Sequence, residues 1–355
     1  MAMADTFIVS ASRKQVWDAK FIAEYVRASQ FSDMMGSDTN KPIYIDRDLI
    51  REKGETKNVP LRAKLSGDGV TGNTSLEGNE ESLNNYNDPV TIEWKRNAVL
   101  VDKREEHATE LDIREGGKMA LKDWFVEEDR DQIIQTLESP SADGLTAYAD
   151  CSEAVKDAWL TANSDRVLFG AASSNTKSTH AASLLELDTT ADKLTYSNVR
   201  AARALMKVAD PLIRPIKIDS KGEFYVAYCN SYAMRDLRIS LDSIHQSGRE
   251  RGLGNPLFQD GDIIFENIVF KEVPEMTSFA DVGAGSAVDV ASVVYCGAQA
   301  VLGCYKQMPK LIVDAKRDYE FRYGVAIEGA RRFKKAYFNS KQHGVFTQYV
   351  AADPS

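Results

Sequence analysis

The chain has 355 residues, of which 43% are apolar and 27% charged, as expected of a soluble protein with a hydrophobic core and about two domains. Its net charge of −9 argues against a protein that grips nucleic acid through a basic surface. No apolar run reaches the ~18 residues of a membrane span, and the start of the chain lacks the basic and apolar regions of a signal peptide. We therefore expect no membrane contact and a protein that stays where it is made, in a cytoplasm.

The cysteines and histidines show neither disulfide nor metal-ligand spacing. The cysteines are Cys151, Cys229, Cys296 and Cys304, and none forms a C-x-x-C pair. The histidines are His107, His180, His245 and His343, far apart in the sequence. We expect buried free thiols, no metal and no cofactor.

Residues 16–28 carry apolar side chains three and four positions apart, which predicts a short amphipathic helix. Its apolar face contains Trp17, Phe21 and Tyr25. A lone helix of this length is marginal in water, so this face needs a surface to cover it. That surface belongs either to the same domain or to a neighbouring copy, and these three residues are candidates for a contact between subunits.

The segment 48–101 is expected to form a long two-stranded hairpin. Leu61–Leu65 and Val90–Lys95 alternate apolar and polar residues, as half-buried strands do. The residues between them, 67–88, are rich in the Gly, Asn and Asp that tolerate turns. A two-stranded ribbon is marginal alone and its open edges pair readily, so it needs a partner surface. The candidate contact residues are Leu61, Arg62, Lys64, Leu65, Glu77, Glu80, Glu81, Glu93 and Trp94.

A long helix is predicted over residues 109–137, with a bend or close backbone packing at Gly116 and Gly117. Beyond it, helices are expected at 151–160, 199–208 and 286–305. Strands are expected at 215–218, 222–229, 263–270, 323–327 and 345–350, with a turn at 253–258. Helices and strands do not alternate regularly, so the fold class is α+β.

Four local motifs suggest chemistry, and each has a simpler structural interpretation. Gly67–Gly72 matches G-x-G-x-x-G, but no helical pattern follows it, so we interpret it as a turn. Gly283–Ser286 before the predicted helix at 286–305 could bind an anion, although a helix N-cap is the simpler interpretation. Glu77, Glu80 and Glu81 lack the spacing of a calcium loop and predict a solvated acidic tip or a patch that pairs with a neighbour. The basic run Arg331–Lys335 could contact nucleic acid or the acidic surface of a sister subunit.

This order of elements resembles the major capsid fold of tailed bacteriophages, the Hong Kong phage type. The sequence of Leu65–Asn73 and Leu76–Glu81 is similar to that of the hairpin loop, called the E-loop, of the N-four-type phage capsid family. Asn255–Phe258, Cys296–Ala300 and Tyr323–Val325 add to the likeness, which covers nearly the whole chain. The resemblance implies an N-terminal arm at 1–47, the E-loop hairpin at 48–101, a peripheral domain at 102–215 with its spine helix at 109–137, an axial domain at 216–330, and a C-terminal return to the peripheral domain at 331–355.

The implied function is self-assembly, as hexamers and pentamers, into an icosahedral phage head that encloses double-stranded DNA, with no enzyme activity. Arg62, Lys64 and Glu93 would pair across the interface of the hairpin with the adjacent subunit, while Leu61, Leu65 and Trp94 are buried there. Deleting residues 67–88 should then leave a soluble body that closes no shells.

The other partners that the resemblance implies are portal, scaffolding and decoration proteins, and DNA that is touched weakly and without sequence specificity. Because the chain starts close to the arm, we expect scaffolding to be a separate protein. We expect no bond between Lys57 or Lys64 and Asn339 of different subunits. The protein would be made in the host cytoplasm and end in the virion. Two alternatives are a non-viral compartment shell and an enzyme with a nucleotide site at Gly283–Gly285.

Overall fold

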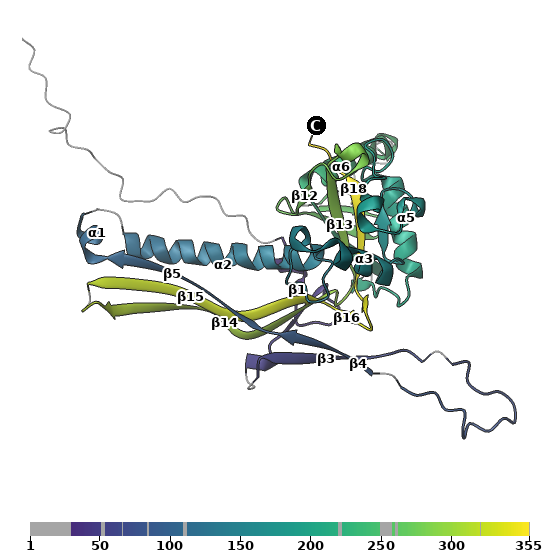
Figure 1. Ribbon diagram of the computed structural model, residues 1–355, viewed down its shortest axis with the longest axis horizontal. Helices are drawn as coiled ribbons and strands as arrows, with labels where there is room; N and C mark the ends of the chain where they lie inside the picture. The colour runs from purple at the N-terminus through teal and green to yellow at the C-terminus, as the bar shows by residue number, and fades with distance from the viewer. Residues whose placement is uncertain are drawn as a thin grey trace, which may run out of the picture. The chain divides into compact units, whose positions relative to one another are not determined.

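The computed structural model describes residues 30–50, 54–65, 67–83, 85–108, 112–218, 222–248, 258–259, 262–319 and 321–354. It mixes helices and strands without regular alternation, which confirms the predicted α+β class (Figure 1). The helix predicted at 16–28 lies outside the described residues, as does the turn predicted at 253–258 except for Phe258, which begins a short strand. No helix in the described part of the chain is long and apolar enough to cross a membrane.

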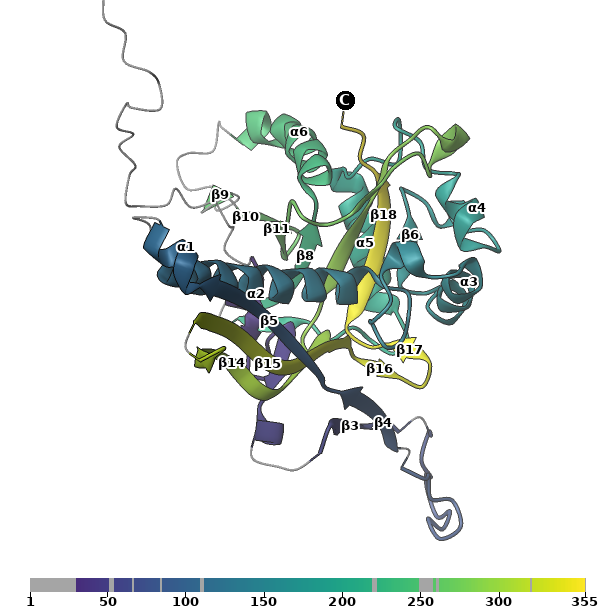
Figure 2. The ribbon, with the colours of Figure 1, turned by 60° about the vertical axis from the view of Figure 1, so that its left-hand side comes forward.

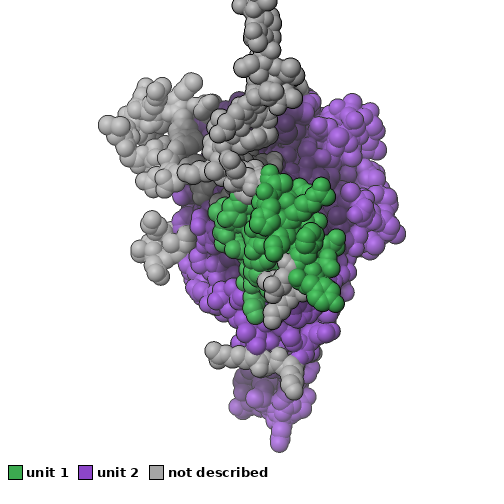
Figure 3. Space-filling model, turned by 90° about the vertical axis from the view of Figure 1, so that its left-hand side faces the viewer, with its two compact units in different colours: residues 1–28, 95–127, 309–329 green, residues 29–94, 128–308, 330–355 purple. Residues whose placement is uncertain are grey.

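The chain divides into two compact units (Figure 3). Of the described residues, unit 1 contains those within 95–127 and 309–329, and unit 2 contains those within 29–94, 128–308 and 330–355. Four long elements contribute residues to both: β5 (Glu93–Asp102), α2 (Ile113–Glu138), β14 (Val301–Arg317) and β15 (Arg322–Lys335).

Unit 1 packs the first half of α2 on strands β5 (Glu93–Asp102), β14 and β15. Leu121 and Phe125 of α2 are buried against Val325 and Ile327 of β15. The predicted helix therefore exists, but it is described from Ile113, after a separate short helix α1 (Lys103–Ala108). Helix α2 runs through both glycines, and a Cβ at Gly117 would lie 3.4 Å from Cγ1 of Val99, so the glycine serves close packing on β5.

Unit 2 is built on a mixed sheet of nine strands among the described residues. The order of its main path is β6 (Val167–Phe169), β18 (Val345–Ala351), β13 (Val290–Cys296), β8 (Gly222–Cys229), β11 (Ile268–Glu272), β10 (Asp262–Phe265) and β9 (Phe258–Gln259). Two short strands extend it: β12 (Ser278–Phe279) pairs with β13, and β7 (Ile216–Ile218) pairs with β8. Strand β13 runs antiparallel to both β18 and β8.

Both faces of this sheet are covered (Figure 2). Helices α5 (Tyr196–Val208) and α6 (Ser231–Gly248) bury one face, where Ala227 and Tyr295 point. The end of α2, with Ile133, Ile134 and Leu137, shares a second buried cluster with Tyr228 and Cys296 on the opposite face. Neighbouring residues of one strand thus point to opposite faces of the sheet, and both faces are buried. Helices α3 (Glu153–Ala162) and α4 (His180–Leu184) add a smaller cluster around Tyr148 and Tyr349.

The helix predicted at 286–305 is wrong. This segment forms β13 and the start of β14, joined by a turn at 297–300. All seven residues of β13 are buried and all but Ser292 are apolar, so the strand shows no alternation of apolar and polar residues. Such a run cannot be distinguished from a buried helix by its period alone.

Other predicted elements hold with shifted bounds. Two predicted helices are confirmed, 151–160 as α3 and 199–208 as α5. Two predicted strands are confirmed, 222–229 as β8 and 345–350 as β18, and β7 lies within the strand predicted at 215–218. The strand predicted at 263–270 is wrong as a single element, because Glu266 and Asn267 form a turn with φ of 51° and 59° and split it into β10 and β11. The strand at 323–327 is part of the much longer β15.

The second sheet has the order β1 (Met35–Gly36), β2 (Ile43–Asp46), β14, β15 and β5. Beside it lie two separate two-stranded ribbons, β3 (Thr56–Arg62) with β4 (Asn85–Thr91), and β16 (Tyr337–Phe338) with β17 (Lys341–Gln342). Single 3-10 turns lie at Ser32–Met34, Asp48–Ile50, Tyr148–Asp150, Ser173–Asn175 and Ala284–Ser286.

Candidate assembly site

The predicted hairpin is present, with bounds that differ from those expected. Strands β3 and β4 are antiparallel, from Thr56 opposite Thr91 to Arg62 opposite Asn85. Ala63 and Leu65 therefore lie beyond the strand, in the loop. The second predicted strand, Val90–Lys95, is divided at Ile92, which lies in no strand. Trp94 on its far side belongs to β5, which pairs with β15 in the five-stranded sheet. The alternation in the sequence continued past the turn of the backbone, so it placed the strand ends wrongly.

The loop that closes the hairpin, residues 63–84, presents leucines to solvent. Leu65, Leu76 and Leu83 are 54%, 61% and 52% exposed. Carboxylates order the backbone around them: Oε2 of Glu81 accepts a hydrogen bond from the Gly67 amide at 2.7 Å, and Oε2 of Glu80 accepts one from the Gly78 amide at 2.8 Å. These leucines, exposed on one loop, are available for contact with another molecule.

The glycine motif within this loop is a turn, as the sequence indicates. Gly69 and Gly72 have φ of 69° and 67°, the left-handed region that glycine adopts without strain. No helix follows Gly72, so the arrangement that a dinucleotide pyrophosphate requires is not formed.

The root of the hairpin is fixed to unit 2 by apolar packing. Val90 and Ile92 are buried in a cluster with Leu302 and Phe338. Leu61 packs partly against the same cluster. The ribbon is thus buried at one end and reaches into solvent at the other.

Two ion pairs, of which the one at Asp88 is buried, fix the same root. Asp88 is 2% exposed and pairs with Nζ of Lys334, which also donates to the Pro89 carbonyl at 3.0 Å. The Tyr337 amide donates to Oδ2 of Asp88 at 3.0 Å. Arg332 pairs with Glu93 at 3.3 Å and donates to the Asp143 carbonyl at 2.9 Å. These groups hold the direction in which the hairpin leaves the body.

The prediction of a basic surface at Arg331–Lys335 is therefore wrong. These cations are at most 9% exposed, because the strand that carries them is buried on both sides. Arg331 pairs with Asp129 of α2, and burial raises the pKa of that carboxyl to about 6 in spite of the guanidinium. Nζ of Lys335 donates to the Ser139 carbonyl at 2.8 Å, and burial lowers the pKa of its ammonium group to about 7. One stretch of β15 thus binds the end of α2 and the hairpin root.

The predicted contact residues are spread over several environments. Lys64, Leu65, Glu77, Glu80 and Glu81 lie together on the exposed loop. Leu61 is half-buried within the subunit, Glu93 has Arg332 of its own chain as a partner, and Trp94 is 50% exposed on β5. The side chain of Arg62 and residues Trp17, Phe21 and Tyr25 lie outside the described part of the structure.

The sequence interpretation missed Leu76, Leu83 and Asp88. The two leucines stand alone among polar residues, so no periodic pattern marks them. Their signal was the presence of leucine in a segment otherwise built of turn residues. Asp88 precedes Pro89 and was interpreted as a turn residue, whereas it is a buried partner of Lys334.

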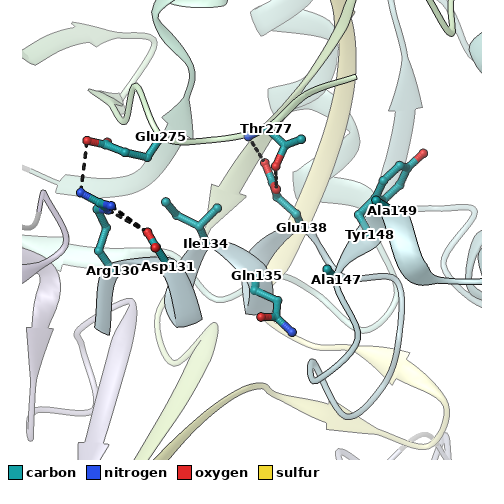
Figure 4. A pocket seen from close by; sticks show the side chains of 10 residues that line it. All are labelled: Arg130, Asp131, Ile134, Gln135, Glu138, Ala147, Tyr148, Ala149, Glu275 and Thr277. Atoms are coloured by element: carbon teal, nitrogen blue, oxygen red, sulfur yellow. Dashed lines mark hydrogen bonds and ion pairs between the residues drawn. The ribbon is translucent and has the colours of Figure 1, made fainter. Parts of the chain in front are cut away.

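A cavity of about 410 Å³ lies in unit 2, beside the end of α2 (Figure 4). Its charged side chains bind one another: Arg130 pairs with Asp131 at 2.9 Å and with Glu275 at 3.4 Å. Glu138 accepts hydrogen bonds from the hydroxyl and amide of Thr277 at 2.7 Å and 3.0 Å, and its pKa is raised by burial. This pairing favours a structural role over ligand binding. Among the described residues, no three His, Cys, Asp or Glu side chains gather as metal ligands would.

The anion site considered at Gly283–Ser286 is also wrong, because no helix follows it. The amides of Gly283 and Ala284 donate to the carbonyls of Val288 and Leu187, both at 2.9 Å. The amide groups that would have held a phosphate are thus used within the loop.

Acid should destabilise the subunit through His180, which is fully buried among Tyr148, Phe169 and Tyr349. Burial lowers its pKa to about 4. Since its folded-state pKa lies below the unfolded value of about 6.5, the stabilisation is present above pH ~6.5 and is lost as the pH falls toward 4. A shift of this size corresponds to about 3 kcal/mol of unfolding free energy.

Urea unfolding at pH 7 and pH 4.5 would measure this loss in the parent chain and in His180→Gln. The parent should lose more unfolding free energy than the variant over this interval. Parallel losses in both chains would show that His180 does not titrate in this way. The four cysteines are free and buried, as expected, and do not complicate the measurement.

Comparisons with known proteins give matches over nearly the whole chain. The sequence model of the family described as phage capsid protein matches residues 6–351. The major capsid protein of Pseudomonas phage KPP25 is 27% identical over 373 residues, which cover 96% of this chain and 95% of that protein. A chain of the cyanophage Pam1 capsid asymmetric unit is 33% identical, with a TM-score of 0.89 and coverage of 99% of this chain and 100% of that one. The capsid of Ralstonia phage GP4 shares the fold at 21% identity, with a TM-score of 0.75 and coverage of 99% and 100%.

Proposed function

The chain belongs to the phage capsid protein family and functions as a major capsid protein, and on this basis we propose that its copies join as hexamers and pentamers of an icosahedral head around double-stranded DNA. The observation that carries the proposal is a hairpin whose root is held by the buried ion pair of Asp88 with Lys334 and whose loop exposes leucines. We propose that this hairpin is a strap that lies across the adjacent subunit.

The strap has the composition of an intersubunit contact. Leu65, Leu76 and Leu83 would be buried against the neighbour, while Lys64 and the loop carboxylates Glu77, Glu80 and Glu81 would pair around them. Contacts of this kind join unlike surfaces, so they close into rings when the rotation between copies permits. Interfaces between permanently associated subunits bury on the order of 2,000 Å² or more.

We assign further roles on the same basis. Residues 1–47 would be the arm, 48–101 the hairpin segment, 102–215 with 331–355 the peripheral domain, and 216–330 the axial domain around each capsomer axis. Portal, scaffolding and decoration proteins would be the other partners, assembly would take place in the host cytoplasm, and the subunit would have no enzyme activity.

Packaged DNA would be touched weakly and without sequence specificity. The net charge of −9 supports this, since like charges keep DNA from adhering. The use of Arg331, Arg332, Lys334 and Lys335 inside the fold supports it further, because the most compact basic run of the sequence is at most 9% exposed.

Replacing Leu65, Leu76 and Leu83 together with serine should prevent shell formation without unfolding the subunit. Burying one leucine is worth about 1.5–3 kcal/mol, so losing three at each contact weakens association by several powers of ten. Since all three are more than half exposed in the subunit, its own unfolding free energy should change little. Sedimentation velocity would compare the fraction of assembled protein, and urea unfolding would compare the stability.

A matched control is the triple variant Thr71→Ala, Asn73→Ala and Thr74→Ala, which changes the same loop and keeps its leucines. This control should assemble like the parent chain. Normal shells from the leucine variant would exclude the leucines as the contact that the strap makes.

A further inference from the structure

Segment 207–217 of unit 2 runs from the last turns of α5 into β7 and presents both apolar and cationic side chains to solvent. Val208 and Leu212 are 78% and 67% exposed, the highest values of any large aliphatic side chain in the described part of the chain. The segment has three cations and one carboxylate, a net charge of +2, and all four are exposed: Lys207, Arg214, Lys217 and Asp210. It is thus suited to a partner that is both apolar and negatively charged.

The backbone of this segment is fixed by distant parts of unit 2. The Asp210 carbonyl accepts a hydrogen bond from Nζ of Lys341 at 2.8 Å. The Arg214 carbonyl accepts one from the Ala298 amide, also at 2.8 Å. Between them Ile213 is only 2% exposed and packs in the cluster that α5 and α6 cover. Because this backbone is already ordered, binding a partner costs little additional conformational entropy in the segment.

The cations of the segment are available to such a partner. In the part of the chain that the structure describes, no carboxylate forms an ion pair with Lys207, Arg214 or Lys217. Arg214 has an uncharged partner, since its Nη1 donates to Oε1 of Gln299 at 3.4 Å. Glu223 lies opposite Lys217 in the register of β7 and β8. We therefore expect the charge contacts mainly at Lys207 and Arg214.

A third exposed aliphatic side chain of unit 2, Ile239 on α6, has different surroundings. It is 62% exposed, but the arginines near it on the helix are paired within the subunit. Arg235 pairs with Asp236 at 3.1 Å, and Arg238 pairs with Glu272 at 3.0 Å. A negatively charged partner would have to displace these carboxylates. The surface at Val208 and Leu212 is therefore the better match for such a partner.

We propose that segment 207–217 is the surface of the adjacent subunit that the hairpin loop covers, an inference that rests on the strap proposed above. The loop, residues 63–84, has four carboxylates and one lysine, a net charge of −3, and three exposed leucines. The segment has the opposite charge and two exposed aliphatic side chains. The loop leucines bury Val208 and Leu212, and the loop carboxylates pair with the cations around them.

Charge reversal on either side tests this contact. Lys207→Glu/Arg214→Glu reverses the segment, and Asp68→Lys/Glu77→Lys reverses the loop. The other two loop carboxylates are kept because they accept hydrogen bonds from the loop backbone. Each double variant alone places like charges at every contact, so the protein concentration needed for assembly should rise about ten-fold or more in sedimentation velocity.

Mixing the two variants distinguishes a contact between chains from a contact within one chain. In the mixture, a reversed loop finds a reversed segment only on another copy, and a native loop finds a native segment only on another copy. An equimolar mixture should therefore assemble where each variant alone does not, as should one chain that carries all four substitutions. Rescue in the single chain without rescue in the mixture would place the contact within one subunit and overturn the proposal. Failure of both rescues would overturn it as well.

Lys177→Glu/Lys193→Glu is the matched control, because it changes the net charge as much as the segment variant and lies elsewhere in unit 2. This control should assemble like the parent chain. Urea unfolding should give the parent's stability for the segment and loop variants, since the substituted side chains are exposed.

Val208→Ser/Leu212→Ser removes the apolar part of the same contact and should raise the assembly concentration as strongly. Normal assembly of this variant and of the segment reversal, with failure of the serine variant of the loop leucines, would overturn the docking surface and leave the strap in place. Normal assembly of the loop leucine variant as well would contradict the strap itself. Normal shells of the segment reversal that retain less DNA would assign the cations to nucleic acid and also overturn the proposal.

Discussion

Replacing residues 63–84 with Asn-Gly should give a folded, soluble subunit that forms no closed shells. Arg62 lies directly opposite Asn85, so a two-residue turn joins β3 and β4 in their native register. The replacement removes Leu65, Leu76 and Leu83 with all the loop carboxylates, and so removes the whole proposed contact. Negative-stain images at concentrations where the parent chain assembles should show no shells, rings or tubes.

The folded state of this variant has its own expected result. Shortening the loop roughly ten-fold lowers the entropy cost of closing it, which adds up to about 2 kcal/mol to the unfolding free energy. The variant also keeps Asp88, which a deletion of 67–88 would remove together with its buried pair to Lys334. Normal shells from a subunit of undiminished stability would show that the hairpin is not the strap.

Lys334→Met should destabilise the subunit by about 3–5 kcal/mol, because it leaves the carboxylate of Asp88 buried without its cation. Asp88 is 2% exposed and would keep the Tyr337 amide as a hydrogen-bond donor at 3.0 Å. The hairpin root would then lose its fixed direction, and assembly should fail along with stability. Urea unfolding of unassembled subunits measures the first effect, and sedimentation measures the second.

The double variant Asp88→Asn/Lys334→Met separates the pair from general damage to the site. Since it removes the unpaired charge, it should recover part of the lost unfolding free energy. The single variant Asp88→Asn completes the comparison. If the double variant loses as much unfolding free energy as Asp88→Asn and Lys334→Met lose together, then Asp88 and Lys334 do not act as a pair. Lys341→Met is a suitable control, since Lys341 is more exposed and pairs with Asp165 at 3.6 Å.

Much of the fold follows from local signals in the sequence. The period of the apolar residues located α3 and α5, and the strand signal at Gly222–Cys229 located β8. The density of Gly, Asn and Asp in 67–88 located the loop of the hairpin. These signals are reliable for two reasons. The helices have one solvent-exposed face, and the strand and the loop are bounded by turn residues whose conformations are decided locally.

The segment 286–305 shows where local signals fail. Strand β13 is dry on both sides because α5 and α6 cover one face of its sheet and the end of α2 covers the other. Its residues therefore show no alternation, and small residues nearby suggest a helix as readily as a strand. Only the packing of distant elements on both faces decided between them.

The sequence by itself determined the α+β class, the existence of a long hairpin with a polar loop, and a resemblance to the phage capsid family that the comparisons confirm. The tertiary structure decided what the charges do. Arg331–Lys335 look like a basic surface when read along the chain, yet the fold buries them between Asp129, Asp88 and Glu93. The reason is physical: a charge is stabilised in the interior only by partners that folding brings from far along the chain, and the sequence does not show those partners side by side.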